Sequence, residues 1–325
     1  MSAVDKGRIL ALVADSGLPR RRALMHLGMP KSTDYRWLKR QGEGRLQDKK
    51  GGSPVPWNRL KPVEEAKILA TARASPELSC RQLALKLVDM EGWYVSESTA
   101  FRILKREGLI KPAEAVGFKA GKEYHRKTSR PNELWATDCS HIKVFDWGWY
   151  YLMTVMDDYS RFILAWELKS DMAAGSLIDV VQKAMDATGM TDIPVEDRTV
   201  LLSDNGAGYL SRQFGEYLRL VGVRHIIASP YHPQTNGKIE RYHRSLEGEI
   251  NQLPYDMLSE LEKAIAVFIE YYNYHRYHEG LGDVTPFDVY TGKHLEIIAK
   301  RKEAKSKTLR ERRDYNRAAR EQGNN

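Results

Sequence analysis

One short run of residues limits what this chain can fold into more than any other. Residues 200–203 are mostly apolar, and an acid, an amide and a glycine follow them as Asp204, Asn205 and Gly206. A short apolar run that is closed by a turn signal is typical of a buried strand that ends in a loop. Open α/β sheets place their functional groups at the carboxyl ends of such strands. The sequence therefore predicts a sheet with Asp204 in a site at its edge.

The segments around this strand predict the kind of sheet. Three segments rich in aromatic and β-branched residues are separated by short turns, which indicates antiparallel strands over 134–144, 149–156 and 162–168. A helix over 173–187, a strand over 199–203, a helix over 211–221 and a strand over 224–228 follow in that order. This succession is typical of a ribonuclease-H-like mixed sheet, so the predicted fold class of this part is α/β.

The N-terminal third differs in kind and predicts helices. Segments 5–14 and 19–27 have apolar residues near helical spacing, and Ser32 is a candidate N-cap for a third helix with interleaved basic residues. The same arrangement recurs over 62–74, 80–89 and 99–107. Three helices of which the last is basic are typical of a helix-turn-helix unit, and a small protein-binding bundle is the alternative. Two all-α units in tandem favour DNA as the partner.

Charge is distributed unevenly along the chain. Residues 1–130 carry 27 basic against 14 acidic side chains, residues 131–291 carry 13 against 24, and residues 292–325 carry 11 against 5, within a net charge of +8. A basic front and a basic tail predict binding to a polyanion. The acidic middle predicts chemistry that uses carboxylates. The tail itself is compatible with a solvated helix, and contact with DNA or with another subunit is the alternative.

These patterns divide the chain into seven parts. No apolar run approaches the ~20 residues that a membrane span needs, and the first residues lack the apolar stretch of a signal peptide. The two cysteines, Cys80 and Cys139, have no metal-type spacing, so we expect a reducing, cytoplasmic setting. The parts are two helix-turn-helix units (1–40 and 62–110), two basic linkers (41–61 and 111–130), the α/β core (131–255), a helical extension (256–291) and the basic tail (292–325).

Two further acids match Asp204 as candidates for a shared site. Asp138 lies inside the first predicted strand, and Glu240 opens a predicted helix over 238–253, with 35 residues between Asp204 and Glu240. Magnesium prefers hard oxygen ligands and keeps several waters, so three carboxylates with substrate phosphate could hold two ions, with Mn²⁺ as a substitute. Two ions ~3.5–4 Å apart suit an in-line displacement at phosphorus. Asp138 would bridge both ions, and Asp204 and Glu240 would each reach one.

Each acid also has a plain structural interpretation. Asp204 alone would be a turn cap, and Glu240 alone an acid on a helix surface. Glu247, two turns further on the same helix, is the rival of Glu240. Other polar residues near these acids could take part as ligands but are interpreted as turn, loop or surface groups: Asp157, Asp158, His232 and His243.

These residues carry a resemblance to the DDE transposases of insertion sequences and to retroviral-type integrases, which share an integrase catalytic core. The matching phrases are Leu-Trp-Ala-Thr-Asp-Cys-Ser, Met-Asp-Asp-Tyr-Ser-Arg, Leu-Ser-Asp-Asn-Gly, Ser-Pro-Tyr-His-Pro-Gln-Thr-Asn-Gly-Lys-Ile-Glu-Arg and, further on, Tyr-Asn-Tyr-His-Arg-Tyr-His-Glu-Gly-Leu-Gly and Thr-Pro. The resemblance covers about residues 131–291, and it extends more loosely over the front units. The zinc-binding His/His/Cys/Cys module of retroviral integrases is missing from the sequence, which favours the insertion-sequence branch.

The resemblance implies roles for individual residues. Asp138, Asp204 and Glu240 would be the catalytic, metal-binding triad. The implied activity is strand cleavage and strand transfer without a covalent enzyme–DNA intermediate, in a homo-oligomer (dimer or tetramer) that bridges two DNA ends. The residues expected to contact DNA come from the helix-turn-helix units, the first linker and the core: Ser32, Arg36, Lys39, Lys49, Lys50, Ser98, Arg102, Lys105, Asn205, Tyr231, Gln234, Lys238, Arg241 and Arg244.

The sequence thus predicts a transposase that binds the terminal inverted repeats of a mobile element, inside a bacterial cell at the nucleoid. Two other classes stay open. A sequence-specific DNA-binding regulator on an inactive core would bind DNA without metal-dependent chemistry. A structure-selective nuclease would cut strands and never join them.

Overall fold

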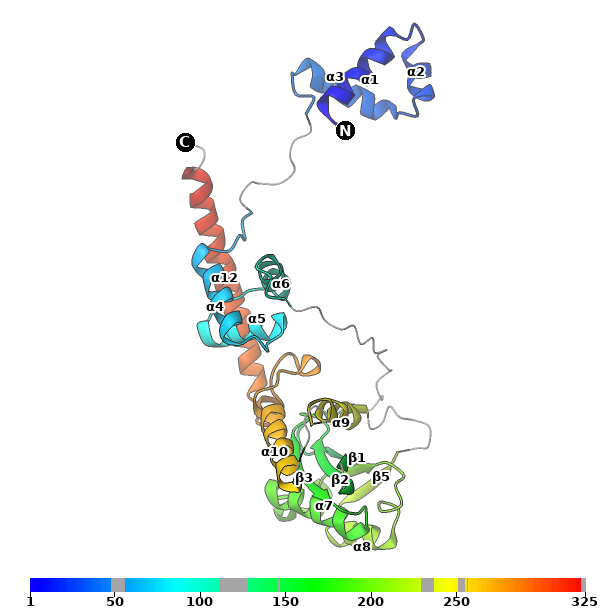
Figure 1. The fold of residues 1–325 in the computed structure, drawn as a ribbon, viewed down its shortest axis with the longest axis vertical. Coiled ribbons are helices and arrows are strands. Elements are labelled where there is room, and N and C mark those ends of the chain that lie inside the picture. Colours follow the sequence, from blue (N-terminus) through cyan, green and yellow to red (C-terminus); the bar gives the residue numbers. More distant parts are fainter. Residues whose placement is uncertain are drawn as a thin grey trace. The chain divides into compact units, whose positions relative to one another are not determined.

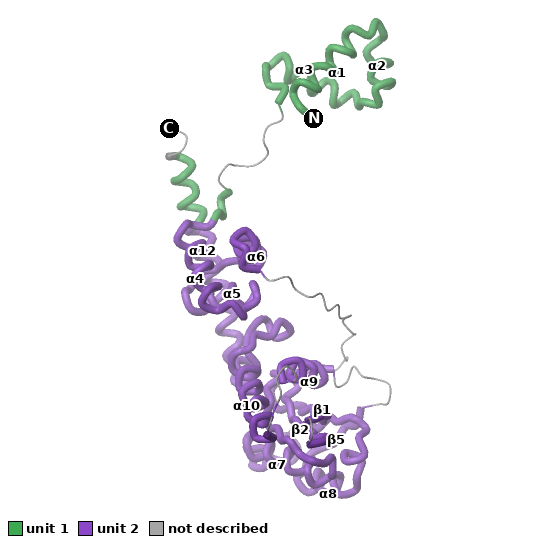
Figure 2. Tube along the Cα trace, viewed as in Figure 1, with its two compact units in different colours: residues 1–59, 312–325 green, residues 60–311 purple. Residues whose placement is uncertain are grey.

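A computed structural model describes residues 1–47, 56–110, 128–144, 147–228, 237–250, 255 and 257–322. The chain divides into two compact units, residues 1–59 with 312–325 and residues 60–311 (Figure 2). Within the described ranges, no helix combines the length and the apolar character that crossing a bilayer requires.

The first unit contains the three N-terminal helices, α1 (Ala3–Asp15), α2 (Arg20–His26) and α3 (Lys31–Gly42). Leu10, Val13, Leu24 and Trp37 are buried between them. The N-cap of α3 is Pro30, so the predicted cap at Ser32 is wrong, and Ser32 lies exposed in the first turn. Proline is tolerated at a helix start, because the backbone N–H that it lacks would have no partner within the helix there.

The second helical group forms part of the second unit: α4 (Pro62–Ala74), α5 (Cys80–Glu91) and α6 (Glu97–Arg106). Ser79 and Ser96 cap α5 and α6, because each side chain accepts a hydrogen bond from a backbone N–H of the first turn. A compact apolar cluster joins the three helices, with Ile68, Leu83 and Leu87 almost fully buried. The predicted succession of helices is confirmed here and in the first unit.

The core is a five-stranded sheet with the order β3-β2-β1-β4-β5. Figure 1 labels four of its strands, β1, β2, β3 and β5. β1 pairs antiparallel with β2, and β2 pairs antiparallel with β3, whereas β4 and β5 run parallel to β1. This is the mixed, ribonuclease-H-like sheet that the sequence predicts. The strands are β1 (Leu134–Val144), β2 (Gly148–Asp157), β3 (Ile163–Lys169), β4 (Val200–Ser203) and β5 (Arg224–Ile227).

Helices cover both faces of the sheet. On one face, α7 (Ala174–Thr188) and α8 (Arg212–Leu220) pack over Trp135 and Leu201. On the other, α9 (Gly237–Ile250) and α10 (Leu258–Tyr274) pack over Ala136 and Leu152. Because strand side chains alternate between faces, Asp138 shares the face of Ala136 and points to the side of α9.

Beyond α10 the chain forms α11 (Pro286–Tyr290) and the long helix α12 (His294–Gln322). One face of α12 packs against the α4–α6 group, where Arg301 pairs with Asp89 and Thr308 Oγ1 accepts a hydrogen bond from the backbone N–H of Tyr94. A fully solvated tail is therefore not what the structure shows. Short 3₁₀ segments complete the fold: Met190–Asp192, Val195–Asp197 and Glu279–Leu281.

Candidate active site

Asp138 and Asp204 stand at the same level of the sheet on neighbouring parallel strands. The register pairs Leu134 with Val200 and Ala136 with Leu202. Asp138, in the middle of β1, and Asp204, directly after β4, each lie two residues beyond that last pair, so the two residues are neighbours across the sheet. The sequence predicts these neighbouring positions, because open α/β sheets place their sites at the carboxyl ends of buried strands and Asp138 lies in the first predicted strand of the same sheet.

Glu240 reaches the site from the first turn of α9. The helix buries Ile239, Tyr242 and Leu246 against the sheet, which leaves Glu240 half-buried beside β1. A cavity of about 410 Å³ opens there. Its lining residues are Asp138, Cys139, Ser140, His141, Glu240, His243, Arg244 and Glu247.

The carboxylates of this site influence one another. Burial raises the pKa of Glu240, and the charge of Asp138 raises this pKa further, while Arg244 and Arg241 oppose the shift. Burial raises the pKa of Cys139 to about 12, with Asp138 and Asp204 adding to the rise. Cys139 therefore stays a neutral thiol at physiological pH. A site whose acids disfavour each other's charge is one that gains from a bound cation.

Asp204 is turned partly away from the other two acids. Its Oδ1 accepts a hydrogen bond of 2.9 Å from the backbone N–H of Gly206, a turn in which the side chain folds back on its own loop. Its side chain is exposed and does not line the cavity. Among the described residues, no three acidic, histidine or cysteine side chains are close enough together to hold a metal ion. The structure thus joins Asp138 and Glu240 and leaves Asp204 at the adjacent strand end.

The donor chemistry of the cavity nonetheless fits a hard divalent cation. Carboxylate oxygens such as those of Asp138 and Glu240 are the ligands that Mg²⁺ prefers, and the exposed Asp204 directly follows the neighbouring strand. Glu247, the rival of Glu240, lines the same cavity, and its Oε1 accepts a hydrogen bond from Ser140 Oγ. Glu247 therefore already has a protein partner.

His243 is a site residue that the sequence interpretation missed. We expected a surface position, but the residue is only 5% exposed, so that expectation is wrong. Its Nδ1 lies 3.3 Å from Asp138 Oδ2, and its Nε2 lies 3.2 Å from Thr154 Oγ1. The signal was its place three residues after Glu240, which puts both on one helix face.

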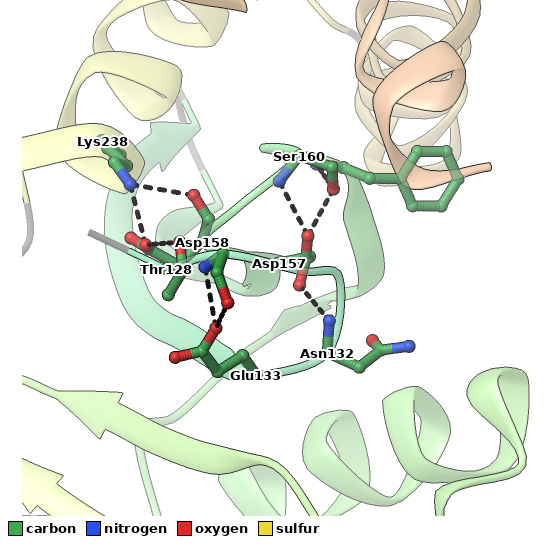
Figure 3. A network of polar contacts seen from close by, with 9 residues as sticks. Thr128, Asn132, Glu133, Asp157, Asp158, Ser160 and Lys238 are labelled. Atoms are coloured by element: carbon green, nitrogen blue, oxygen red, sulfur yellow. Dashed lines mark hydrogen bonds and ion pairs between the residues drawn. The ribbon is translucent and has the colours of Figure 1, made fainter. Parts of the chain in front are cut away.

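Asp157 is the last residue of β2 and Asp158 follows it, and both form polar contacts with distant segments of the core (Figure 3). Asp157 is fully buried and accepts hydrogen bonds from the backbone N–H groups of Ser160 and Asn132 at 2.8 and 2.7 Å. These contacts agree with the structural role expected for it. Asp158 forms an ion pair of 2.7 Å with Lys238, one of the residues predicted to contact DNA.

The residues predicted to contact DNA through the helix-turn-helix units are exposed on α3 and α6. Ser32, Arg36 and Lys39 have the spacing i, i+4, i+7 on α3, and Ser98, Arg102 and Lys105 repeat it on α6. Each set therefore forms one face of its helix. Asn205, Arg241 and Arg244 are exposed near the acidic site. Lys49, Lys50, Tyr231 and Gln234 lie outside the described residues.

Comparison with known proteins shows which described domains the chain is similar to. Residues 128–233 match a family model described as an integrase core domain, and residues 221–286 match a second model of that description. Residues 33–104 match a homeodomain-like domain.

The chain is also similar to individual proteins. A putative transposase for insertion sequence element IS986/IS6110 from Mycobacterium tuberculosis (strain ATCC 25618 / H37Rv) is 25% identical, over 62% of this chain and 77% of that protein. A Gag-Pro-Pol polyprotein from squirrel monkey retrovirus is 29% identical, over 38% of this chain and 6% of that protein. Among solved structures, the HTLV-2 integrase catalytic core domain in complex with magnesium is 20% identical with a TM-score of 0.38, and covers 51% of this chain and 99% of its own. The family matches and the insertion-sequence relatives confirm the resemblance predicted from the sequence.

Proposed function

We propose that this chain, which has the integrase-like core of an insertion-sequence DDE transposase, binds the terminal inverted repeats of a mobile element and cleaves and joins DNA strands at Asp138, Asp204 and Glu240. The observation that carries the proposal is the meeting of Asp138 and Glu240 in one acidic cavity on β1, the strand that pairs with β4, which Asp204 directly follows. The carboxylates are the catalytic groups, and the attacking oxygen belongs to water or to a DNA 3′-hydroxyl. No side-chain nucleophile is required.

Asp138, Asp204 and Glu240 would hold divalent cations, two Mg²⁺ ions or Mn²⁺ in their place. When bound, such a pair supplies Lewis-acid stabilisation of the attacking and leaving oxygens at phosphorus. The protein's own contribution is to gather hard oxygen donors in a half-buried cavity and to keep them oriented. His243 holds Asp138 from one side, and the α9 backbone holds Glu240 from the other.

DNA recognition is assigned to the exposed faces of α3 and α6, with Arg241 and Arg244 holding phosphates beside the cavity. Lys49 and Lys50 in the first linker and Tyr231 and Gln234 before α9 would add contacts to the same DNA. Strand transfer between two element ends requires two copies of the site, so we propose a homo-oligomer as the working form. We place it on nucleoid DNA in the bacterial cytoplasm.

The test is an assay with labelled element-end DNA and Mg²⁺ or Mn²⁺, scored separately for binding, nicking and joining. Glu240→Gln should abolish nicking and joining and leave binding unchanged, because it removes a charged oxygen donor but no DNA-recognition residue. Glu216→Gln is the matched control, since Glu216 is an exposed acid that pairs with Arg212 on α8. Retained joining by Glu240→Gln would refute the assignment.

One observation favours a second candidate, a DNA-binding regulator on an inactive core. Asp204 is turned into its own loop, and no three-ligand metal group exists among the described residues. The regulator predicts specific binding and no cation-dependent nicking by the unaltered protein. Nicking without joining would instead identify a nuclease.

A further inference from the structure

The position of α9 along the sheet decides where Glu240 lies. The helix is held first by apolar contacts, since Ile239, Tyr242, Leu246 and Ile250 are all buried. Such contacts are strong but non-directional. A slip of one helical turn would move Glu240 by about 5.4 Å, which exceeds what a catalytic constellation tolerates. Something directional must therefore fix the helix lengthwise.

A directional contact exists at the start of the helix (Figure 3). Lys238 Nζ donates to the backbone oxygen of Asp158 at 2.9 Å and to its carboxylate Oδ2 at 2.7 Å. The Asp158 side chain is 9% exposed and that of Lys238 29% exposed. Charge-assisted hydrogen bonds of this length in a half-buried setting are geometrically specific.

Asp158 is itself fixed to the core. Thr128 Oγ1 donates to its Oδ2 at 2.8 Å, and its backbone N–H donates to Leu134 O at 2.9 Å. The residue therefore ties together the entry of the chain into the core, the first residue of β1 and the first turn of α9. Because Asp158 is held by these contacts, it can in turn fix the position of Lys238.

Electrostatics explains why an acid is needed here. A lysine in the first turn of a helix faces the positive end of the helix dipole, which is unfavourable. The Asp158 carboxylate offsets both the lysine charge and the dipole. The pair thus stabilises a helix start that the lysine alone would weaken.

Glu240 lies between this contact and a second one. It is two residues after Lys238 and three residues before His243, which contacts Asp138. The span from 238 to 243 is about 7.5 Å along the helix axis. Two polar contacts at the ends of so short a span leave Glu240 little freedom to shift along the sheet.

We propose that Asp158 and Lys238 are a positioning pair that sets Glu240 opposite Asp138. This inference rests on the proposed function of the acidic site. In this proposal Lys238 positions the start of α9 by binding Asp158, which differs from the DNA contact that the sequence predicts. The pair acts before DNA arrives, because all of its partners belong to the core.

A double-mutant cycle on the full-length protein tests the pair. Asp158→Asn and Lys238→Met should each lower kcat for strand cleavage about 10–100-fold, as loss of a partner that orients a ligand does. KM for DNA should stay within about twofold. The double variant should be no slower than the slower single variant, because both changes remove one contact. Lys238→Arg, which keeps the charge and the donor, should retain most activity.

The contrary pattern would identify Lys238 as a DNA contact. In that case Lys238→Met weakens DNA binding, Asp158→Asn leaves cleavage unchanged, and the two effects add. Asp179→Asn is the matched control, because Asp179 forms a 3.0 Å ion pair with Lys169 and belongs to α7, on the opposite face of the sheet. This control should leave every readout unchanged.

A second measurement does not depend on activity. Hydrogen exchange of the backbone amides of 240–243, without DNA or metal, should become about tenfold faster in Asp158→Asn and unchanged in Asp179→Asn. If the unaltered protein neither cuts nor joins DNA, the proposed function fails while this measurement still decides the pair. Unchanged exchange together with unchanged kcat would overturn the pair and leave the proposed function intact.

Discussion

In the absence of cations the acidic site lowers the stability of the folded protein, and this effect can be measured at Glu240. The pKa of Glu240 is raised above its ordinary value of 4.5, first by burial and then by Asp138. The folded state therefore disfavours the ionised carboxylate, and stability falls as the pH rises from 4.5 through the raised pKa. Glu240→Gln removes this penalty, so its Tm should exceed that of the unaltered protein at pH 7–8 by about 1–3 °C.

Thermal scans with a chelator present measure this effect. The two proteins should converge as the pH falls below 4, where Glu240 becomes protonated in both the folded and the unfolded state. Addition of Mg²⁺ should favour the unaltered protein, because only it keeps all three carboxylates. A lower Tm for Glu240→Gln at every pH would contradict the inference that burial and the charge of Asp138 disfavour the ionised form of Glu240.

His278 gives the opposite pH dependence. Burial, helped by nearby arginines, lowers its pKa from 6.5 to about 3, and the imidazole packs edge-on against Tyr272. The folded state therefore resists protonation while the unfolded state accepts it. The corresponding stability is present above pH 6.5 and is lost progressively as the pH falls towards 3. Urea titrations of His278→Gln across this range should show a flatter pH profile than those of the unaltered protein.

At the scale of elements, the loop that carries Asp204 is fixed by a close approach at Gly208. A Cβ on Gly208 would lie 2.6 Å from Met172 O and 2.7 Å from Leu177 Cδ1, at the start of α7. Gly208→Ala should therefore destabilise the protein by about 1–3 kcal/mol, as overpacking does. Gly215→Ala is the matched control, since its Cβ would meet open space inside α8 and should stabilise slightly. Urea unfolding of both variants measures the difference.

The elements themselves could largely be predicted from the sequence. β1 is predicted with its observed limits, because aromatic and β-branched residues from 134 to 144 end at a turn. The limits of β4 differ by one residue from the prediction. Periodicity and turn residues are local signals, so they define where elements lie. The same signals placed Asp138, Asp204 and Glu240 at the ends or faces of their elements.

What escaped prediction depends on contacts between distant segments. The burial of His243 follows from the packing of α9 over β2, which no local pattern encodes. The rotation of Asp204 follows from a hydrogen bond to its own loop. The pairing of Lys238 follows from the position of Asp158, 80 residues earlier. Side-chain contacts between distant segments depend on the tertiary structure, so they cannot be predicted from the local patterns of a single sequence.

At the scale of the whole molecule, α12 links the second helical group to the segment that follows α10. Arg301 donates to both carboxylate oxygens of Asp89 at 2.7 and 2.6 Å, and to the backbone oxygen of Asp283 at 2.6 Å. Tyr277 adds a 2.8 Å hydrogen bond to Asp89, and Arg81 forms a two-bond pair with Asp283. The helix-turn-helix unit of α4–α6 is thus docked within the unit that contains the sheet.

The docking contacts spare the face of α6 that is predicted to meet DNA. They arise from α5 and from the turn at Tyr94, whereas Ser98, Arg102 and Lys105 remain exposed. The docking therefore holds α6 and leaves this predicted DNA-binding face open. If the docking positions α6 so that bound DNA reaches the acidic site, loss of the docking contacts should leave DNA binding intact. Cleavage at the correct position should then be impaired.

Arg301→Leu tests this coupling. Removing the guanidinium leaves the partly buried Asp89 without its bidentate partner, which destabilises the docked arrangement. Amide exchange in α5 should become at least about tenfold faster, while affinity for element-end DNA changes little and accurate cleavage falls. Arg310→Leu is the matched control, because Arg310 is exposed on the same helix. Equal cleavage by both variants, with exchange in α5 accelerated only in Arg301→Leu, would show that docking serves stability alone and that α6 can act on DNA independently of the acidic site.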